Sequence, residues 1–374
     1  MAPAEGVATP GFPSPPNQGQ WSSLPPMSVP RLAFTATLLL DGRVLIAGGR
    51  TRPFADSPDG SPTSAVEIFD PATRTFSRVP SLGTPRDGHT TTLLPSGKVL
   101  VAGGDPIGTA EIYDPVSNTW SLTARMKSRR FDHAAALISG GRVLVTGGGS
   151  APPVGISARG SQRAQLPAEI YDPAADTWTV AATPILDRPE YPTATALRDL
   201  RVLVVGGQYL YNSPDEATET AEVYDPRTNR WSATTPETRT GARQYHTATL
   251  LPTGNVLVAG GWQDGREIAW SVLYNPITNS WTQLPNMNDT RCGHGAQMLQ
   301  TGLVIVMGSG CWSGMTASAE EFDPISNRWY PVAGLAHPRG KLEAVALRDG
   351  EVLALGGGMP TNFPTAVAEV FSAS

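Results

Sequence analysis

Short apolar runs of four or five residues recur along the chain, and each run ends at a pair of small residues. The run at residues 99–102 reads Val-Leu-Val-Ala and is followed directly by two glycines. Successive pairs lie 44 to 59 residues apart, which is the spacing of propeller blades or solenoid units. The pairs are Gly48-Gly49, Gly103-Gly104, Gly147-Gly148, Gly206-Gly207, Gly260-Gly261, Gly308-Ser309 and Gly356-Gly357.

The pattern inside one period predicts four short strands joined by tight turns. In residues 86–126 the turns contain Pro95, Gly97 and the pair Asp114-Pro115, residue types that favour turns over regular structure. Strands are expected at residues 89–94, 98–102, 110–113 and 120–122. Each period should therefore form one four-stranded antiparallel meander, and we see no convincing amphipathic helix.

The second half of the period recurs with a fixed spacing. A Tyr or Phe opens a turn with Asp-Pro or Asn-Pro, and a Trp or Phe follows seven residues later, as in Tyr113 and Trp120. Glu111 stands two residues before that Tyr. Together with the glycine pair, these features resemble the kelch repeat family over nearly the whole chain. The resemblance implies an all-β, seven-bladed kelch β-propeller with four-stranded antiparallel blades. It leaves function open, because kelch propellers serve as oxidases, epimerases and binding modules.

The two ends of the chain indicate how the ring closes. The last repeat stops at Phe371 without a Trp strand, whereas Trp21 begins a strand-like segment before the first repeat. We expect this N-terminal strand to complete the last blade, which removes free sheet edges; a six-bladed ring with one stray repeat is the alternative. Residues 1–20 are rich in Pro, Gly and Ser and are expected to form a disordered leader. The expected blades are residues 27–82, 83–126, 127–185, 186–237, 238–287, 288–335, and 336–374 with 21–27.

Composition narrows the functional classes. The 374 residues include 28 Lys and Arg against 33 Asp and Glu, a net charge of -5 with no cationic run, so a nucleic-acid partner is not expected. The longest apolar runs are far shorter than the roughly 20 residues of a membrane helix, so no membrane partner is expected either. Because no secretory signal opens the chain, we expect a cytoplasmic protein.

The connections between second and third strands vary most in length, and they lie at the same end of the ring as the starts of the first strands. Variable loops on a rigid scaffold commonly carry function. Aromatic side chains that the repeat does not use gather there: Trp262, Trp270, Trp312, Tyr209, Tyr211, Phe54 and Phe363. They predict a pocket for an apolar or sugar-like small molecule, or else they pack the loops onto neighbouring blades. Loop arginines would suit an acidic protein partner: Arg50, Arg52, Arg159, Arg163 and Arg266.

Four histidines occupy one repeat position at the start of the first strand, and an arginine precedes each by three residues. The pairs are Arg86 and His89, Arg130 and His133, Arg243 and His246, and Arg291 and His294. Because both residues recur with the repeat, we interpret them mainly as structural rather than as a metal site. Residues that depart from the repeat at this mouth are Asp132, Glu190, Tyr191, Tyr245, Lys341 and Glu343.

These departures bring acids, bases and phenols to one end of the channel. Burial and charged neighbours shift the pKa of such groups toward neutrality, which suits general acid/base catalysis. The catalytic candidates are Glu190, Tyr191, Tyr245, His246, Asp132, His133, His294, Lys341 and Glu343, and Arg130 and Arg243 are candidates for ligand binding. In the alternative interpretation Asp132 and Glu343 simply pair with the arginines of the repeat.

The two cysteines are expected to be cross-strand neighbours. If Thr301-Gly302 forms the hairpin turn, Cys292 lies directly opposite Cys311; a bulge would shift the register by one residue. A cytosolic thiol pair is the expected state, and a disulfide or a redox-active pair is the alternative.

Tyr245-His246 is similar to the tandem Tyr-His that supplies copper ligands in the kelch domain of galactose oxidase. The resemblance would make copper a cofactor, with His294 a further ligand. The pattern breaks in the next blade, where Gly340, Lys341 and Leu342 stand in place of the Cys-linked Tyr. We therefore expect no cofactor and keep copper as the minority alternative.

The leading hypothesis is a cofactor-independent lyase, isomerase or cyclase that acts on a small, partly apolar molecule. The first alternative is a module without catalysis that binds a protein, or a carbohydrate through Trp262 and Trp312. The second alternative is a copper-dependent oxidase.

Overall fold

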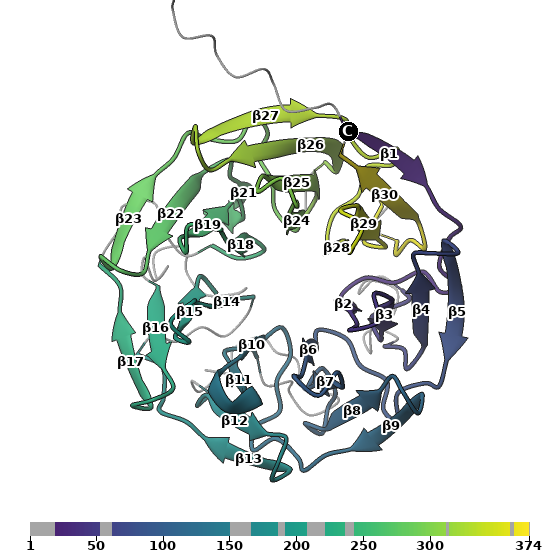
Figure 1. Cartoon of the computed structure of the whole chain (residues 1–374), viewed down its shortest axis with the longest axis vertical. Helices are drawn as coiled ribbons and strands as arrows, with labels where there is room; N and C mark the ends of the chain where they lie inside the picture. Colours follow the sequence, from purple (N-terminus) through teal and green to yellow (C-terminus); the bar gives the residue numbers. More distant parts are fainter. Residues whose placement is uncertain are drawn as a thin grey trace, which may run out of the picture.

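The computed structural model describes residues 19–52, 62–149, 166–185, 191–207, 221–235, 243–311, 314–359 and 363–373. Within them, seven four-stranded antiparallel sheets stand as blades around a central channel (Figure 1). This confirms the all-β, seven-bladed propeller. The innermost strands, from blade 1 to blade 7, are β2 (Thr35–Leu38), β6 (Thr90–Leu93), β10 (Ala134–Leu137), β14 (Thr193–Ala196), β18 (Thr247–Leu250), β24 (Gly295–Met298) and β28 (Glu343–Ala346).

The second and third strands of each blade form the core, because they are covered on both faces by neighbouring blades. Continuous Val, Leu and Ile runs suit strands with two buried faces. The second strands are β3 (Val44–Ala47), β7 (Val99–Ala102), β11 (Val143–Thr146), β15 (Val202–Val205), β19 (Val256–Ala259), β25 (Val304–Ser309) and β29 (Val352–Leu355), and all are buried. The third strands are β4 (Val66–Asp70), β8 (Ala110–Asp114), β12 (Glu169–Asp172), β16 (Glu222–Asp225), β22 (Ser271–Asn275), β26 (Thr316–Asp323) and β30 (Ala368–Ser372).

The outermost strands explain the repeated aromatic pair. Each third-strand Tyr or Phe packs on the outer-strand Trp or Phe of its blade, with ring centroids 4.9 to 5.2 Å apart. The Tyr113 hydroxyl also donates to Asn118 in the turn between the strands, at 2.8 Å. The outer strands are β5 (Thr75–Val79), β9 (Thr119–Leu122), β13 (Thr177–Val180), β17 (Arg230–Ala233), β23 (Ser280–Gln283), β27 (Arg328–Val332) and β1 (Gln20–Ser23).

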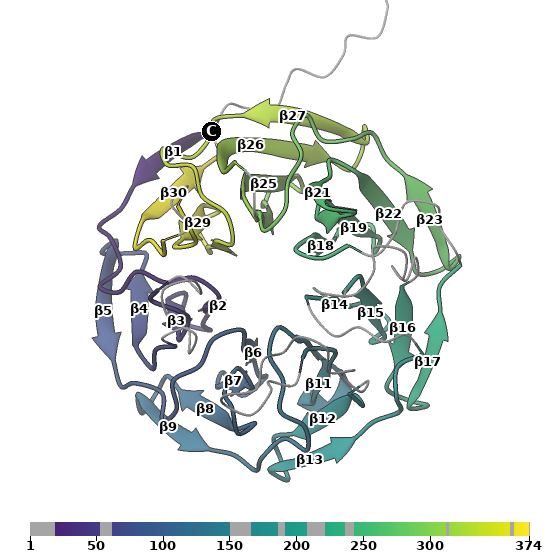
Figure 2. The same ribbon diagram turned by 180° about the vertical axis from the view of Figure 1, so that it is seen from behind.

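The N-terminal strand closes the ring as expected. β1 pairs antiparallel with β30, and Trp21 lies opposite Phe371, with ring centroids 5.2 Å apart. The Trp21 indole donates to the Ala333 carbonyl in blade 6 at 2.8 Å. Seen from either side, β1 lies beside β30 (Figures 1 and 2). The six-bladed alternative is therefore wrong.

In blades 1, 2, 3, 6 and 7 a buried arginine ties the start of the blade to its third strand. Arg86 donates to Glu111 at 2.6 Å and to the Gly103 carbonyl at 2.6 Å, and it is fully buried. The same ion pair recurs, at 2.6 to 3.1 Å, as Arg31 with Glu67, Arg130 with Glu169, Arg291 with Glu320 and Arg339 with Glu369.

The glycine pair forms the joint to the next blade. The second glycine donates its N–H to the carbonyl of the next blade's arginine, as from Gly104 to Arg130 at 2.9 Å. The first glycine has a φ between 54° and 69° in every blade, and a Cβ on Gly103 would lie 2.7 Å from the same carbonyl. Only glycine fits such a close backbone approach at positive φ.

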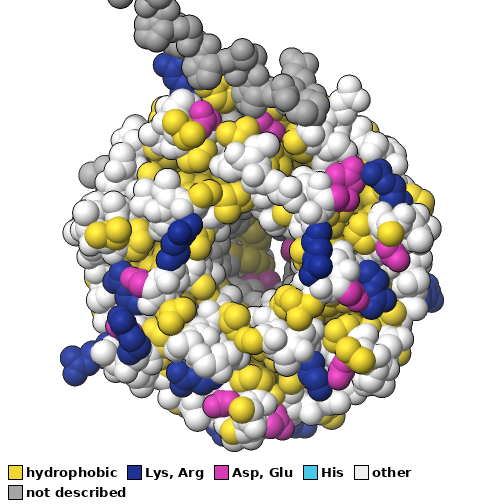
Figure 3. All heavy atoms as spheres, in the orientation of Figure 1, with side chains coloured by type: hydrophobic (Ala, Val, Ile, Leu, Met, Phe, Trp, Pro, Cys, Tyr) yellow, Lys and Arg dark blue, Asp and Glu magenta, His cyan; other side chains and the backbone are white. Residues whose placement is uncertain are grey.

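On the face seen in Figure 3, the Lys and Arg side chains of the described residues do not gather into one patch. Lys and Arg side chains are dispersed around the hollow centre of the ring in the space-filling view (Figure 3). Among the described residues, no helix has the length and apolar character of a membrane span.

Breaking one buried arginine–glutamate ion pair should destabilise the whole propeller. Arg86→Met leaves the Glu111 carboxylate buried without its cation, which costs about 3–5 kcal/mol of unfolding free energy. Arg74→Met is the matched control, because Arg74 pairs with Glu351 at the surface, where such a pair contributes about 0–1 kcal/mol. Equilibrium urea unfolding measures both changes. Equal losses in the two variants would contradict a structural role for the buried pair.

Candidate functional site

One residue per blade, just before or at the start of the innermost strand, adopts a left-handed backbone conformation. These seven residues have φ between 52° and 59° and are called the mouth ring here: Ala33, Gly88, Asp132, Tyr191, Tyr245, Gly293 and Lys341. Backbone N–H groups link neighbouring members around the channel, as from Asp132 to Gly88 at 2.8 Å and from Gly293 to Tyr245 at 2.8 Å. These hydrogen bonds of the mouth ring connect neighbouring blades in addition to the contacts between the glycine pairs and the arginines.

Large side chains stand at positions where this backbone shape is unfavourable. A left-handed φ is rare for residues other than Gly, Asn and Asp, and such residues cluster at functional sites. Tyr191, Tyr245 and Lys341 all carry it. The fold therefore holds three reactive side chains in place at a conformational cost.

The two glycines of the mouth ring make room for their neighbours' side chains. A Cβ on Gly293 would lie 3.1 Å from Cγ of Lys341, and a Cβ on Gly88 would lie 2.5 Å from Oδ1 of Asp132. Lys341, in blade 7, thus reaches across blade 6, and its Nζ lies 4.7 Å from the ring centroid of Tyr245 in blade 5. Tyr245 in turn packs on Tyr191 of blade 4, with ring centroids 4.1 Å apart.

Burial and nearby charges change the pKa of the Lys341 ammonium group in this cluster. Burial lowers the pKa of Lys341, and the positive charge of Arg50 lowers it further, whereas the carboxylate of Asp132 opposes the change. Arg50 itself forms a buried ion pair with Asp87, whose pKa is raised by burial. The cluster therefore favours a neutral amine more than water does.

Glu343 lies two residues beyond Lys341, on the face of β28 that packs against blade 1. Its equivalents Thr35, Thr90 and Thr247 each contact a histidine of the next blade, but blade 1 has Phe34 at the histidine position. Glu343 has no hydrogen-bond or ion-pair partner among the described residues, so the alternative of pairing with a repeat arginine fails within that part of the chain. Burial raises the pKa of Glu343 to about 8.

The repeat histidines lie between blades rather than in the channel mouth. Nε2 of each is 2.9 to 3.0 Å from a threonine Oγ1 of the preceding blade: His89 with Thr35, His133 with Thr90, His246 with Thr193 and His294 with Thr247. All four are buried. Burial first, and then the neighbouring arginine, lowers the pKa of His133 and of His294 to about 3. This geometry supports the structural interpretation.

The candidates for ligand binding differ in how exposed they are, and several lie outside the described residues. Arg130 and Arg243 are fully buried, and Arg130 is bound to Glu169. Trp262 is half-buried in the hairpin of β20 (Trp262–Gln263) and β21 (Arg266–Glu267), and its backbone pairs with Gln244 beside Tyr245. Trp270 is half-buried just before β22, and Phe363 is exposed. The candidates Glu190, Trp312, Tyr209, Tyr211, Phe54, Arg159 and Arg163 lie outside the described residues.

The cysteines correct two sequence-based expectations. Cys292 and Cys311 form a disulfide, with Cα atoms 5.8 Å apart, instead of the expected thiol pair. The expected register is also wrong, because the β24–β25 turn has three residues between Leu299 and Leu303, and Cys292 lies opposite Gly310. The bond therefore joins diagonal rather than directly opposed positions.

The sequence interpretation missed Glu267, which contacts this disulfide, and the mouth ring as a repeating backbone feature. Signals for both were present. Ser309 replaces the second glycine in blade 6 only, and Gly88 and Gly293 stand at the repeat position that Tyr245 fills in blade 5.

The copper interpretation does not fit the described donor groups. His246 and His294 are committed to threonines of different blades, and Cys292 is in a disulfide. Across the part of the chain that the structure describes, no three His, Cys, Asp or Glu side chains gather in a way that would hold a metal ion.

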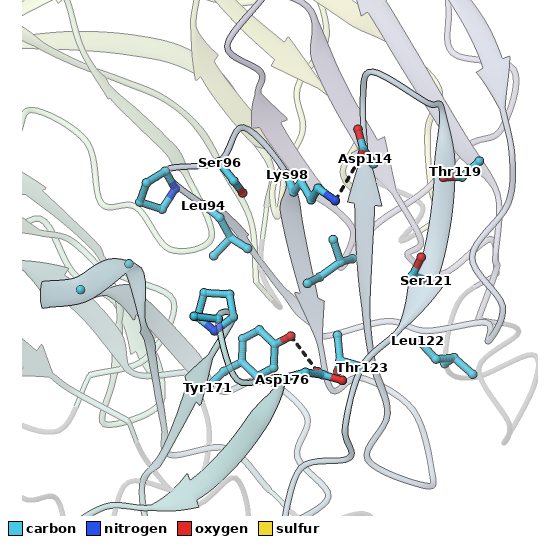
Figure 4. A pocket seen from close by; sticks show the side chains of 16 residues that line it. Leu94, Ser96, Lys98, Asp114, Thr119, Ser121, Leu122, Thr123, Tyr171 and Asp176 are labelled. Carbon is cyan, nitrogen blue, oxygen red and sulfur yellow. Dashed lines mark hydrogen bonds and ion pairs between the residues drawn. The ribbon is translucent and has the colours of Figure 1, made fainter.

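A hollow lies between blades 2 and 3, at the end of the blades opposite the mouth ring. It encloses about 620 Å³ and is lined by the hairpin turns at Pro95, Gly140 and Pro173. In Figure 4 its polar groups are already paired, Lys98 with Asp114 at 3.0 Å and Tyr171 with Asp176 at 2.9 Å. We assign no chemical function to this hollow.

Comparisons with known proteins agree with this architecture. A family model described as the Kelch motif matches residues 31–83 and 245–288, and the chain is a kelch-repeat β-propeller. Among solved structures it is similar to a fungal alcohol oxidase of the AA5 family in complex with copper, at 17% identity and a TM-score of 0.76, covering 96% of this chain and 77% of that one. At this identity the likeness shows the fold alone. No curated protein matches the chain.

The protonation of Lys341 can be measured directly. Its reaction rate with a small acylating reagent, followed by peptide mass spectrometry from pH 6 to 11, should show a midpoint below the ordinary value of 10.5. Asp132→Asn should move the midpoint lower still, because it removes the charge that favours the ammonium, and Asn tolerates the left-handed backbone. A midpoint at or above 10.5, or an upward shift in the variant, would contradict this description of the cluster.

Proposed function

We propose that the mouth ring is the active site of a cofactor-independent enzyme that transfers protons on a small, partly apolar molecule, in a lyase, isomerase or cyclase reaction. The observation that carries the proposal is the contact of Lys341 with Tyr245 across Gly293. It brings a base, a phenol and an aromatic stack together from blades 4, 5 and 7.

The roles follow from the chemistry of each group. A lysine with a lowered pKa is a better base near neutral pH, and Lys341 would take a proton from the substrate as the neutral amine. The phenol of Tyr245 or Tyr191 would donate a hydrogen bond or a proton to the oxygen that gains charge. Glu343 keeps its proton at neutral pH because its pKa is about 8, and it is a second possible acid along β28.

The aromatic rings suit an apolar or planar substrate. Tyr191 and Tyr245 present a stacked pair, and Trp262 is held close to Tyr245 by the backbone pairing with Gln244. Small-molecule sites commonly combine such apolar walls with a few fixed polar groups.

A protein-binding or carbohydrate-binding module without catalysis is the alternative. Of the loop arginines expected to contact an acidic partner, Arg50 is already paired with Asp87, whereas Arg52 and Arg266 are exposed. The cytoplasmic location also stays a prediction, and the disulfide argues against it, because disulfides persist mainly in oxidising compartments.

The proposal is tested by ligand screening followed by turnover. Small carbonyl compounds and sugars are screened by thermal shift against the full chain, and those that stabilise it are incubated and followed by mass spectrometry. Lys341→Met and Tyr245→Phe should each lower turnover about 10²- to 10⁴-fold, the usual contribution of a positioned acid or base.

Lys98→Met is the matched control, because Lys98 lines the hollow between blades 2 and 3, at the end of the blades opposite the mouth ring. It should leave turnover unchanged. Unchanged turnover in Lys341→Met, or stabilisation by acidic peptides with no small-molecule conversion, would overturn the enzymatic proposal.

A further inference from the structure

Several departures from the repeat in blade 6 converge on one carboxylate of blade 5. Glu267 Oε1 lies 3.4 Å from Sγ of Cys292 and accepts from the N–H of Cys311 at 3.3 Å. Its Oε2 accepts from the hydroxyl of Ser309 at 2.9 Å. Ser309 replaces the second glycine of the repeat and is fully buried. The repeat itself requires none of these four side chains, which indicates a separate purpose.

We propose that Cys292, Cys311 and Glu267 form a thiol–disulfide exchange site in which Glu267 carries the proton of Cys292. Cys311 retains the larger exposed fraction, 6% against 0% for Cys292, so Cys311 is the sulfur that an outside thiol reaches. Cys292 is then the leaving group, and it is the sulfur that Glu267 contacts. The natural co-reactant is a dithiol, either a small molecule or a dithiol protein.

The electron and proton balance is as follows. A thiolate of the dithiol attacks Sγ of Cys311, the Cys292–Cys311 bond breaks, and its electron pair goes to Sγ of Cys292, which takes the proton from Glu267. The second thiol of the reductant loses its proton to solvent and attacks the outer sulfur of the mixed disulfide, which releases Cys311 as a thiolate. The dithiol is oxidised by two electrons, the protein disulfide is reduced by two, and solvent protonates Glu267 and Cys311.

The surroundings of Glu267 suit this role. Burial raises the pKa of Glu267, and the hydrogen bonds from Ser309 and Cys311 and the charge of Arg291 only partly oppose this, so the carboxyl holds its proton more readily than a carboxyl in water. A protonated acid beside the leaving sulfur speeds cleavage, because a sulfur that leaves as a thiol is a better leaving group than a buried thiolate. The disulfide also borders the mouth ring, since a Cβ on Gly293 would lie 3.6 Å from Sγ of Cys311.

The test is reduction of the folded, full-length protein by dithiothreitol. Thiols are counted by alkylation and mass spectrometry, and circular dichroism reports the fold. We expect both cysteines to become alkylated while the β-sheet signal is retained, and oxidised dithiothreitol to restore the bond. Reduction that occurs only after unfolding in urea would overturn the proposal.

Variants separate a proton carrier from a structural contact. At a fixed thiolate concentration, the wild-type rate should fall as pH rises through the Glu267 pKa. Glu267→Gln should be at least about tenfold slower below that pH and should lack the inflection. Ser309→Ala should move the inflection to higher pH, because it removes a hydrogen bond that favours the carboxylate.

Asp264→Asn is the matched control, because Asp264 is an exposed carboxylate in the turn of the same hairpin, and Asn tolerates its positive φ. It should leave both the rate and the pH profile unchanged. A wild-type rate and profile in Glu267→Gln would contradict the role of Glu267.

Discussion

The joint between a glycine pair and the next blade's arginine is the constraint on which the propeller depends. The first glycine has no room for a Cβ, and the second donates its N–H to the arginine carbonyl. The arginine side chain then turns inward to its own blade and pairs with the third-strand glutamate. Burying either charge alone is costly, so the arginine and the glutamate occur together in blades 1, 2, 3, 6 and 7, whereas Val272 stands at the glutamate position of blade 5. One short sequence pattern thereby fixes both the interior of a blade and its angle to the next.

This division gives many polar residues near the channel a structural contact. Five of the buried arginines are bound to glutamates, and the four histidines are bound to threonines of the preceding blade. Where a blade lacks the histidine, the preceding blade lacks the threonine: a Cβ on Gly295 would lie 3.0 Å from Leu342, and Phe34 stands at the histidine position of the blade that follows Glu343. In the mouth ring the left-handed backbone recurs in every blade, whereas the residue type varies among the blades. The acid and base groups of the proposed function thus stand at positions where the repeat does not fix the side chain.

The fold was predictable because its signals are periodic: the glycine pair, the Tyr and Trp spacing and the unpaired ends at Trp21 and Phe371 each follow from local geometry. The site was only partly predictable. Sequence reasoning selected Tyr245 and Lys341 as departures from the repeat, but their contact depends on the space above Gly293, which no spacing rule reveals. The register at Cys292 was misjudged by one residue because two-residue and three-residue turns share the same Gly302 signal. Glu267 was missed because it lies on a hairpin within a loop, outside the repeat.

If the four repeat histidines serve as contacts between blades, as their hydrogen bonds to threonines indicate, we expect them not to bind a transition metal. The most direct measurement is the copper, zinc and iron content of the purified protein, before and after incubation with each metal and removal of the excess. Metal well below one ion per chain, with unchanged stability, is the expected result. A stoichiometric ion that is lost in His246→Ala or His294→Ala would contradict it, because those imidazoles would then be ligands rather than contacts between blades.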